Sequence, residues 1–140
     1  MSSVRKNNQS PHRFTTLDLI LDAYDHTTTL TANEKIFDRT YKALIDDLNN
    51  EAAMIYHCCR TANEDYDNRI KEEAEIRLKL EDEAIAHCRW LKTDILLAQR
   101  RFHLRAKKVV YWNGLVDTAL KSIKNWNAEE KRNYKELHGL

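Results

Sequence analysis

The chain contains 140 residues, of which 42% are hydrophobic and 32% charged, and its formal net charge is +1. This length and apolar fraction suit one domain with one core. The chain has only two glycines and one proline, which argues against a sheet-rich fold with many turns, and its near-neutral charge excludes a uniform polycation.

The first fifteen residues are polar and predict a flexible basic arm. They include Arg5, Lys6 and Arg13, and residues 1–14 contain no acidic residue. The arm lacks the apolar segment of a signal peptide, and no run in the chain approaches the roughly 18 apolar residues of a membrane-spanning helix. We therefore expect a cytoplasmic protein that does not associate with membranes.

The cysteines also favour a cytoplasmic location. There are three of them, Cys58, Cys59 and Cys88, and the first two are adjacent in the sequence. An odd count with two neighbours that cannot easily pair argues against a disulfide framework, which is typical of proteins in a reducing compartment.

A first helix is predicted from Thr15 or Thr16 to about Thr31. Its apolar stripe consists of Leu17, Ile20, Leu21 and Tyr24. The threonines at 27–29 are weak helix formers because β-branched side chains lose rotamer freedom, so packing would have to hold them in the helix. We expect the chain to turn at residues 32–34.

Two long helices follow, over residues 38–63 and 69–101, with the polar residues 64–68 between them. Apolar residues recur in both at steps of mostly three or four, which is the period of a helix and not of a strand. In the second helix this seam comprises Tyr41, Leu44, Leu48, Ala52, Ile55, Cys59 and Ala62. In the third it comprises Ala74, Leu78, Ala84, Ile85, Cys88, Leu91, Ile95, Ala98 and Phe102.

A fourth helix is predicted from Arg105 to just beyond Trp126. Its seam alternates steps of three and four, the spacing of left-handed bundles, and comprises Val109, Trp112, Val116, Ala119, Ile123 and Trp126. Gly114 lies inside this helix and suggests a close approach of a neighbouring helix. Residues 127–140 lose the seam and predict a charged tail.

The four seams predict an all-α fold, an antiparallel up-down-up-down four-helix bundle over residues 16–126. We expect burial of Leu48, Ile55, Leu91, Ile95, Val116 and Ile123, and partial burial of Trp90. Further apolar residues lie off the seams and indicate self-association: Ile76, Leu80, Trp90, Leu96, Tyr111, Leu115 and Leu120.

No pattern of an enzyme is present. The chain has no Glu-x-x-His motif of di-iron bundles, no glycine-rich phosphate loop, no nucleophile elbow and no dinucleotide fingerprint. One group could approach a tetrahedral zinc site, namely His57, Cys58, Cys59, His87 and Cys88. Cys59 and Cys88 fall on the seams, however, so the core interpretation is favoured. We expect no catalytic residue, metal or cofactor.

The strongest functional signal is a basic segment. Residues 89–108 contain seven bases and one acid, whereas residues 64–83 contain nine acids and four bases, so the two ends of the folded chain should differ in charge. Several cations close together suit phosphate-backbone contact, although an ordinary solvated helix end is the alternative. The candidate nucleic-acid-binding residues are Arg89, Lys92, Arg100, Arg101, His103, Arg105, Lys107 and Lys108.

Short motifs in all four predicted helices resemble one bacterial family in their order and spacing. They lie at residues 24–26, 31–37 and 41, then 51–52, 55–56 and 62–64, then 83–85, 88 and 91, and finally 111–112, 115–116 and 126. The family is the accessory variability determinant of diversity-generating retroelements, four-helix-bundle proteins related to those of ribosomal-RNA intervening sequences. The resemblance covers about residues 20–130 and implies a homopentameric barrel. It also implies binding to the element's reverse transcriptase and template RNA in support of mutagenic cDNA synthesis.

Three hypotheses therefore remain open. The chain is a non-catalytic accessory protein of a retroelement, with a reverse transcriptase, template RNA or cDNA and itself as partners. Alternatively, it is a structural homo-oligomer or interaction module without a nucleic-acid role. The third hypothesis, far behind, is a metal-dependent enzyme.

Overall fold

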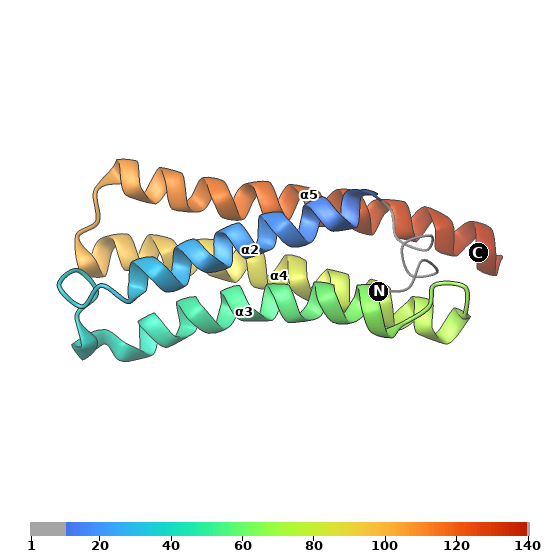
Figure 1. Ribbon diagram of the computed structural model, residues 1–140, viewed down its shortest axis with the longest axis horizontal. Coiled ribbons are helices and arrows are strands. Elements are labelled where there is room, and N and C mark those ends of the chain that lie inside the picture. Colours follow the sequence, from blue (N-terminus) through green and yellow to red (C-terminus); the bar gives the residue numbers. More distant parts are fainter. Residues whose placement is uncertain (1–10, 140) are drawn as a thin grey trace.

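The computed structural model describes residues 11–139, with side chains described from residue 15. Four long helices are connected by a short 3-10 turn and by loops: α2 (Pro11–Thr31), η1 (Arg39–Tyr41), α3 (Lys42–Asp65), α4 (Lys71–Phe102) and α5 (Ala106–His138). No strand occurs within 11–139. Successive helices run in opposite directions, and α2 packs against both α3 and α5 while α4 packs against the other sides of these two (Figure 1). The predicted all-α four-helix fold is confirmed.

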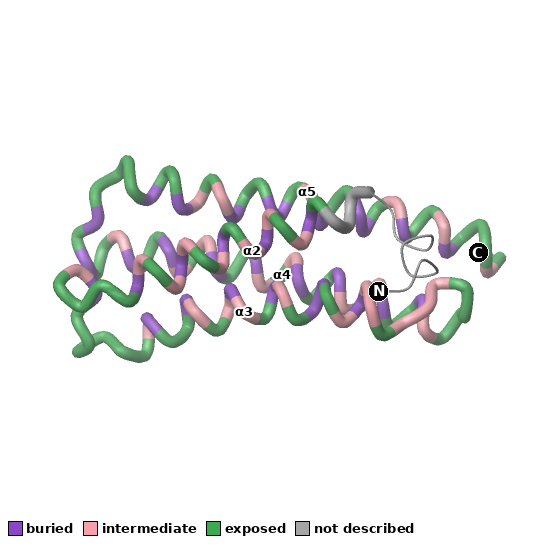
Figure 2. Tube along the Cα trace, in the orientation of Figure 1, coloured by how far each residue is buried: buried purple, intermediate pink, exposed green. Residues whose placement is uncertain are grey.

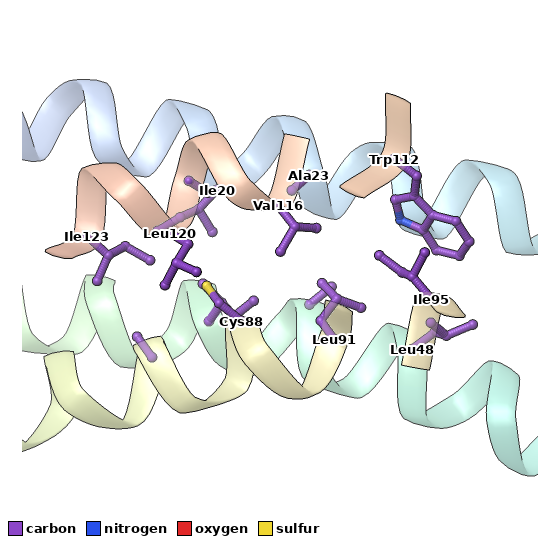
Figure 3. Packing of buried hydrophobic residues seen from close by; sticks show 14 of the residues in the cluster. Ile20, Ala23, Leu48, Cys88, Leu91, Ile95, Trp112, Val116, Leu120 and Ile123 are labelled. Carbon is purple, nitrogen blue, oxygen red and sulfur yellow. The ribbon is translucent and has the colours of Figure 1, made fainter. Parts of the chain in front are cut away.

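The helix seams meet in one core along the bundle axis. All six residues singled out as core are buried, as are all six members of the α5 seam. Figure 3 shows Leu91 and Ile95 of α4, Leu48 of α3 and Val116 and Ile123 of α5 pointing toward one another from three helices. Burial of such side chains contributes about 1.5–3 kcal/mol each, and this drives four amphipathic helices together. None of the helices over 11–139 combines the length and apolar character needed to cross a bilayer.

The weak helix formers of α2 are helical because their hydroxyl groups are hydrogen-bonded in the core. The Thr27 hydroxyl donates to the Ala23 carbonyl at 2.7 Å and accepts from the Trp112 indole at 3.0 Å. Thr31 likewise donates to the Thr27 carbonyl at 2.8 Å and accepts from Asn49 of α3 at 3.0 Å. Packing therefore overrides the low helix propensity, and the seam of α2 is partly made of threonines.

The helix boundaries differ from the predicted ones mainly at the two ends of the chain. Residues 11–15, assigned to a flexible arm, already belong to α2, since Pro suits the first turn of a helix. The rest of the predicted arm, residues 1–10, lies outside the described residues. The α3 helix begins at Lys42 rather than 38, because Asp38 caps the preceding η1 turn through the backbone amide of Thr40.

The predicted tail over 127–140 is instead helical to His138, because its polar residues are buried with partners. Figure 2 shows buried positions recurring into the last turns of α5. Asn127 donates to Glu81 at 3.1 Å, and Tyr134 donates to Glu75 at 2.5 Å. These partners lie on α4, so a polar seam continues the apolar one.

Glu130 is the centre of this polar seam. It accepts two hydrogen bonds from Arg77, at 3.0 Å and 2.5 Å, and one from the Trp126 indole at 2.9 Å. The Arg77 guanidinium also donates to the carbonyls of Ala62 and Tyr66, at 2.6 Å and 2.7 Å. It thereby binds the C-terminal end of α3, where helix carbonyls lack intrahelical partners, to α5. Arg77 and Glu130 are 2% and 6% exposed.

Several expectations about single residues are wrong. Trp90 is 61% exposed rather than partly buried, and Tyr41 lies at the surface rather than in the core. Gly114 is exposed, and an added Cβ would meet no atom within 4 Å, so it marks no close helix approach. Of the off-seam residues, Leu120 is buried in the core, whereas Leu96 and Tyr111 are exposed.

Candidate nucleic-acid interface

Two connections that are far apart in the sequence share one end of the bundle. The α2–α3 connection and the α4–α5 turn both lie at the left of Figure 1, while the acidic α3–α4 connection lies at the opposite end. The predicted difference in charge between the two ends is therefore present. The C-terminal half of α5 also reaches the acidic end, where Lys131 pairs with Asp82 at 3.5 Å.

The α4–α5 turn exposes alternate side chains. His103 ends α4 in the left-handed conformation with φ 55°, and the amides of His103 and Leu104 both donate to the Gln99 carbonyl. Phe102 and Leu104 are buried and hold the turn to the core, whereas His103 and Arg105 point outward and are exposed. We call the exposed cluster formed by Arg100, Arg101, His103, Arg105, Lys107 and Lys108 the basic end.

The cations of the basic end surround the termini of two helices with opposite dipoles. Arg100 and Arg101 lie in the last turn of α4, where the helix dipole favours positive charge. Lys107 and Lys108 lie in the first turn of α5, where the dipole disfavours it, and that turn contains no acid. The positive end of the α5 dipole and the charges of these lysines therefore add, and an anion bound there would relieve the repulsion between them.

A groove of about 300 Å³ lies between the two connections at this end. It is lined by Lys35, Ile36, Phe102, His103, Leu104, Arg105 and Lys108. Lys35 comes from the α2–α3 connection, so three cations from two distant segments converge around one concave surface. Phosphate oxygens are the ligands that such a set of flexible cations binds.

The cations of the basic end are not used in ion pairs within the described part of the bundle. Four of them have no described carboxylate within 4 Å: Arg100, Arg105, Lys107 and Lys108. The guanidinium of Arg101 lies over the Tyr41 ring, 4.8 Å from its centroid. The neighbouring Arg39 and Lys42 differ: they pair with Glu34 at 3.7 Å and Asp46 at 2.6 Å. Unpaired cations are the ones available to an external anion.

Two of the predicted site residues do not join this cluster. Arg89 lies twelve residues before Arg101 on α4, which is about 18 Å along a helix. Lys92 is half-buried and pairs with Asp117 of α5 at 2.5 Å. The structure therefore brings together six of the eight predicted residues and separates Arg89 and Lys92 from them.

The field of the basic end also acts on a half-buried histidine ring. His26 of α2 packs edge-on against Tyr111, with ring centroids 5.1 Å apart. Burial lowers the pKa of His26, and the positive charge of Lys108 lowers it further. The ring is therefore neutral at neutral pH, and it adds no charge to the basic end.

The cysteines and histidines of the bundle centre do not form a metal site in the described residues. No group of three or more His, Cys, Asp or Glu side chains within the described chain is arranged to hold an ion. Cys59 and Cys88 are fully buried, and burial raises the pKa of Cys88 to about 12. His57 is exposed, whereas His87 pairs with Glu51 at 2.5 Å. The thiols are thus protonated core side chains at neutral pH.

Lys35 is the basic groove residue that the sequence reasoning missed, because it lies in a segment with no excess of bases. The topology contains the signal that could have found it. In an up-down-up-down bundle the first and third connections meet at one end, so the bases of both should have been considered together.

Comparison of the chain with models of protein families, with curated proteins and with solved structures found no match.

Proposed function

We propose that this chain is a non-catalytic accessory protein that binds the phosphate backbone of RNA through its basic end. The observation that carries the proposal is the set of exposed, unpaired cations around the α4–α5 turn: Arg100, Arg105, Lys107 and Lys108, together with Lys35 across the groove. Phosphate contact requires several cations close together and little else. No helix or strand edge with base-reading side chains accompanies them in the described residues, so binding should be largely independent of sequence.

The biological setting of this proposal comes from the family resemblance. The motifs of residues 24–126 resemble those of accessory variability determinants, so we propose that the RNA is the template of a diversity-generating retroelement. The partner is then the element's reverse transcriptase, which carries out the mutagenic cDNA synthesis. The chain would supply RNA contacts and a docking surface rather than chemistry.

Self-association, as a pentamer in the resembled family, would multiply the charge of the basic end. Exposed apolar side chains are available for it, among them Trp90, Leu96, Val110 and Tyr111, which are 57–70% exposed. In a ring, the five basic ends would form a continuous cationic belt. The same apolar residues also favour the alternative function, a structural oligomer. That alternative predicts that light scattering detects an oligomer and that this oligomer does not bind RNA.

Neutralising the basic end tests the proposal. We expect replacement of Arg100, Arg101, Arg105, Lys107 and Lys108 by glutamine to weaken RNA binding about tenfold or more near 0.1 M salt, because phosphate contacts are lost. Helical content should be unchanged, since all five side chains are exposed. Fluorescence anisotropy with a labelled RNA measures the affinity, and circular dichroism checks the fold.

The control removes the same charge elsewhere. Five exposed bases outside the basic end are replaced by glutamine: Lys71, Lys79, Lys124, Arg132 and Lys135. This variant should bind RNA within about threefold of the parent, because most of its charge changes lie beyond the screening length of the site. Equal weakening in both variants would show that net charge alone matters and that the site assignment is wrong.

A further inference from the structure

A second groove, of about 450 Å³, lies beside the basic end between the start of α3 and the end of α4. Its lining combines an aromatic ring, two leucines and two guanidinium groups, provided by Tyr41, Leu44, Leu97, Arg100 and Arg101, and it also includes Thr40 and Ala43. Leu97 is 51% exposed and Tyr41 38% exposed. The neighbouring cationic groove also has an apolar lining, from Ile36, Phe102 and Leu104. This groove differs in having an exposed aromatic ring beside two guanidinium groups.

Tyr41 is held in place rather than free to move. Its ring packs edge-on against Phe102, with centroids 5.7 Å apart, and Phe102 packs in turn against Phe37 at 4.7 Å. The Arg101 guanidinium lies over the Tyr41 ring at 4.8 Å. Since Tyr41 is also fixed by the η1 turn, the Tyr41–Arg101 pair forms a pre-organised stacking wall.

The charges around this groove are polarised along its length. Arg100 and Arg101 lie at the rim nearest the end of the bundle. About two helical turns further in, acidic residues lie on both helices, Asp94 on α4 and Asp47 and Glu51 on α3. Burial raises the pKa of Asp94, and the charges of Asp47 and Glu51 raise it further. A phosphate is attracted to the arginine rim and repelled by the acidic residues of the inner end. An acidic peptide extended along the groove would also be repelled by these residues.

A nucleobase has the matching chemistry. It is flat, its faces stack on aromatic rings and guanidinium planes, and its own backbone phosphates need cations nearby. The groove is large enough for one base, since small-ligand pockets begin at about 300 Å³. Phe102 contacts Tyr41 and also lines the cationic groove, so the two grooves adjoin.

We infer that this groove binds one unpaired base of single-stranded RNA, stacked on the Tyr41–Arg101 pair against Leu97, while the adjoining cations bind the flanking phosphates. The inference rests on the proposed RNA binding and adds a preference to it. Bases in a duplex are stacked on each other and cannot enter the groove, so the basic end should bind single strands more tightly than duplexes of equal length.

The test replaces Tyr41 by alanine and compares two probes, an RNA single strand of about 12 nucleotides and a blunt RNA duplex of the same length. Loss of base stacking should weaken single-strand binding about fivefold or more. Duplex binding should stay within about twofold of the parent, because phosphate contacts are unchanged. Tyr41→Phe keeps the ring and should bind single strands like the parent.

Leu137→Ala is the control, since Leu137 is 57% exposed, lies near the end of α5 and is not part of this groove. It should leave single-strand binding unchanged. A 2-aminopurine base in the single strand gives a second measurement: its fluorescence should be quenched on binding by the parent and less so by Tyr41→Ala. Circular dichroism and thermal unfolding show whether the alanine variant is folded.

Three outcomes would overturn the base site. The first is equal weakening of single-strand and duplex binding by Tyr41→Ala, and the second is no weakening of either. The third is binding of a peptide of alternating glutamate and leucine that Tyr41→Ala abolishes while RNA binding is unchanged, which would assign the groove to a protein partner. A parent protein that binds neither RNA probe at low salt would instead overturn the proposed function as well.

Discussion

Replacing Arg77 by methionine should lower the free energy of unfolding by about 3–5 kcal/mol, because it leaves the buried carboxylate of Glu130 without its cation. Arg77 also donates to the carbonyls of Ala62 and Tyr66, which would lose these hydrogen bonds. Burial raises the pKa of Glu130, but the hydrogen bonds from Arg77, Glu81 and Trp126 and the charge of Arg77 together outweigh this and hold that pKa below its ordinary value. Urea unfolding followed by circular dichroism measures the loss.

A second substitution separates the buried pair from simple loss of packing. The double variant Arg77→Met with Glu130→Gln removes the unpaired charge, so it should recover part of the lost stability. As a control, Arg89→Met changes an exposed arginine on the same helix and should alter stability by no more than about 0.5 kcal/mol. If Arg77→Met unfolds at the same urea concentration as Arg89→Met, the buried pair does not stabilise the bundle.

Replacing Glu81 by glutamine should stabilise the protein at neutral and alkaline pH, by roughly 2 kcal/mol near pH 8. Glu81 is fully buried; burial first, and then Glu130, raise its pKa from 4.5 to about 10. The groups that face it are Arg77, Glu130 and Asn127, and its charge would also act on Cys59. Glutamine resembles the protonated acid, since it can accept from Asn127 and donate to Glu130.

The direction in which Glu81 changes the stability with pH follows from proton binding. Between pH 4.5 and about 10 the folded chain keeps the Glu81 proton, while the unfolded chain has released it. The contribution of Glu81 to stability is therefore fully present below pH 4.5 and is lost as the pH rises toward about 10. The gain from Glu81→Gln should grow with pH across this range.

Guanidinium unfolding at a series of pH values measures this gain. Glu83→Gln, at an exposed position two residues away, is the control and should leave the pH profile of the parent unchanged. A Glu81→Gln variant that is less stable than the parent near pH 8, or a gain that does not change with pH, would show that Glu81 is ionised in the folded chain.

The apolar spacing predicted the fold well because it reports directly on which residues leave water. The α5 seam, Val109, Trp112, Val116, Ala119, Ile123 and Trp126, follows a strict alternation of three and four, and all its members are buried. Loops were found by the loss of this spacing and by polar runs. For α3 and α4 this placed each boundary within four residues of the structure.

Where polar residues form the core, the same reasoning failed. Glu81, Asn127 and Glu130 read as solvated positions. Only their three-dimensional pairing explains their burial: Glu130 pairs with Arg77, and Asn127 donates to Glu81. The helix was therefore expected to end at the last apolar seam residue, Trp126. Buried threonines such as Thr27 were missed for the same reason, since their partner Trp112 lies 85 residues away.

The candidate site was predictable in part. The bases of the α4–α5 turn lie within nine residues of one another in the sequence, so a local charge count finds them. Lys35 and Tyr41 lie in another segment, and only the shared end of the bundle brings them beside Arg105 and Arg101. In contrast, Arg89 and Lys92 belong to the same run of sequence but lie further along α4.

RNA binding by the intact chain as a function of salt tests the central claim most directly, namely that unpaired cations at the basic end bind the RNA backbone. We expect the logarithm of the association constant to fall linearly with the logarithm of salt concentration, with a slope of about −3 or steeper for five engaged cations on a single strand. Between about 50 and 200 mM salt this is a loss of roughly 60-fold or more. No binding at about 50 mM salt, or a slope near zero, would contradict the account.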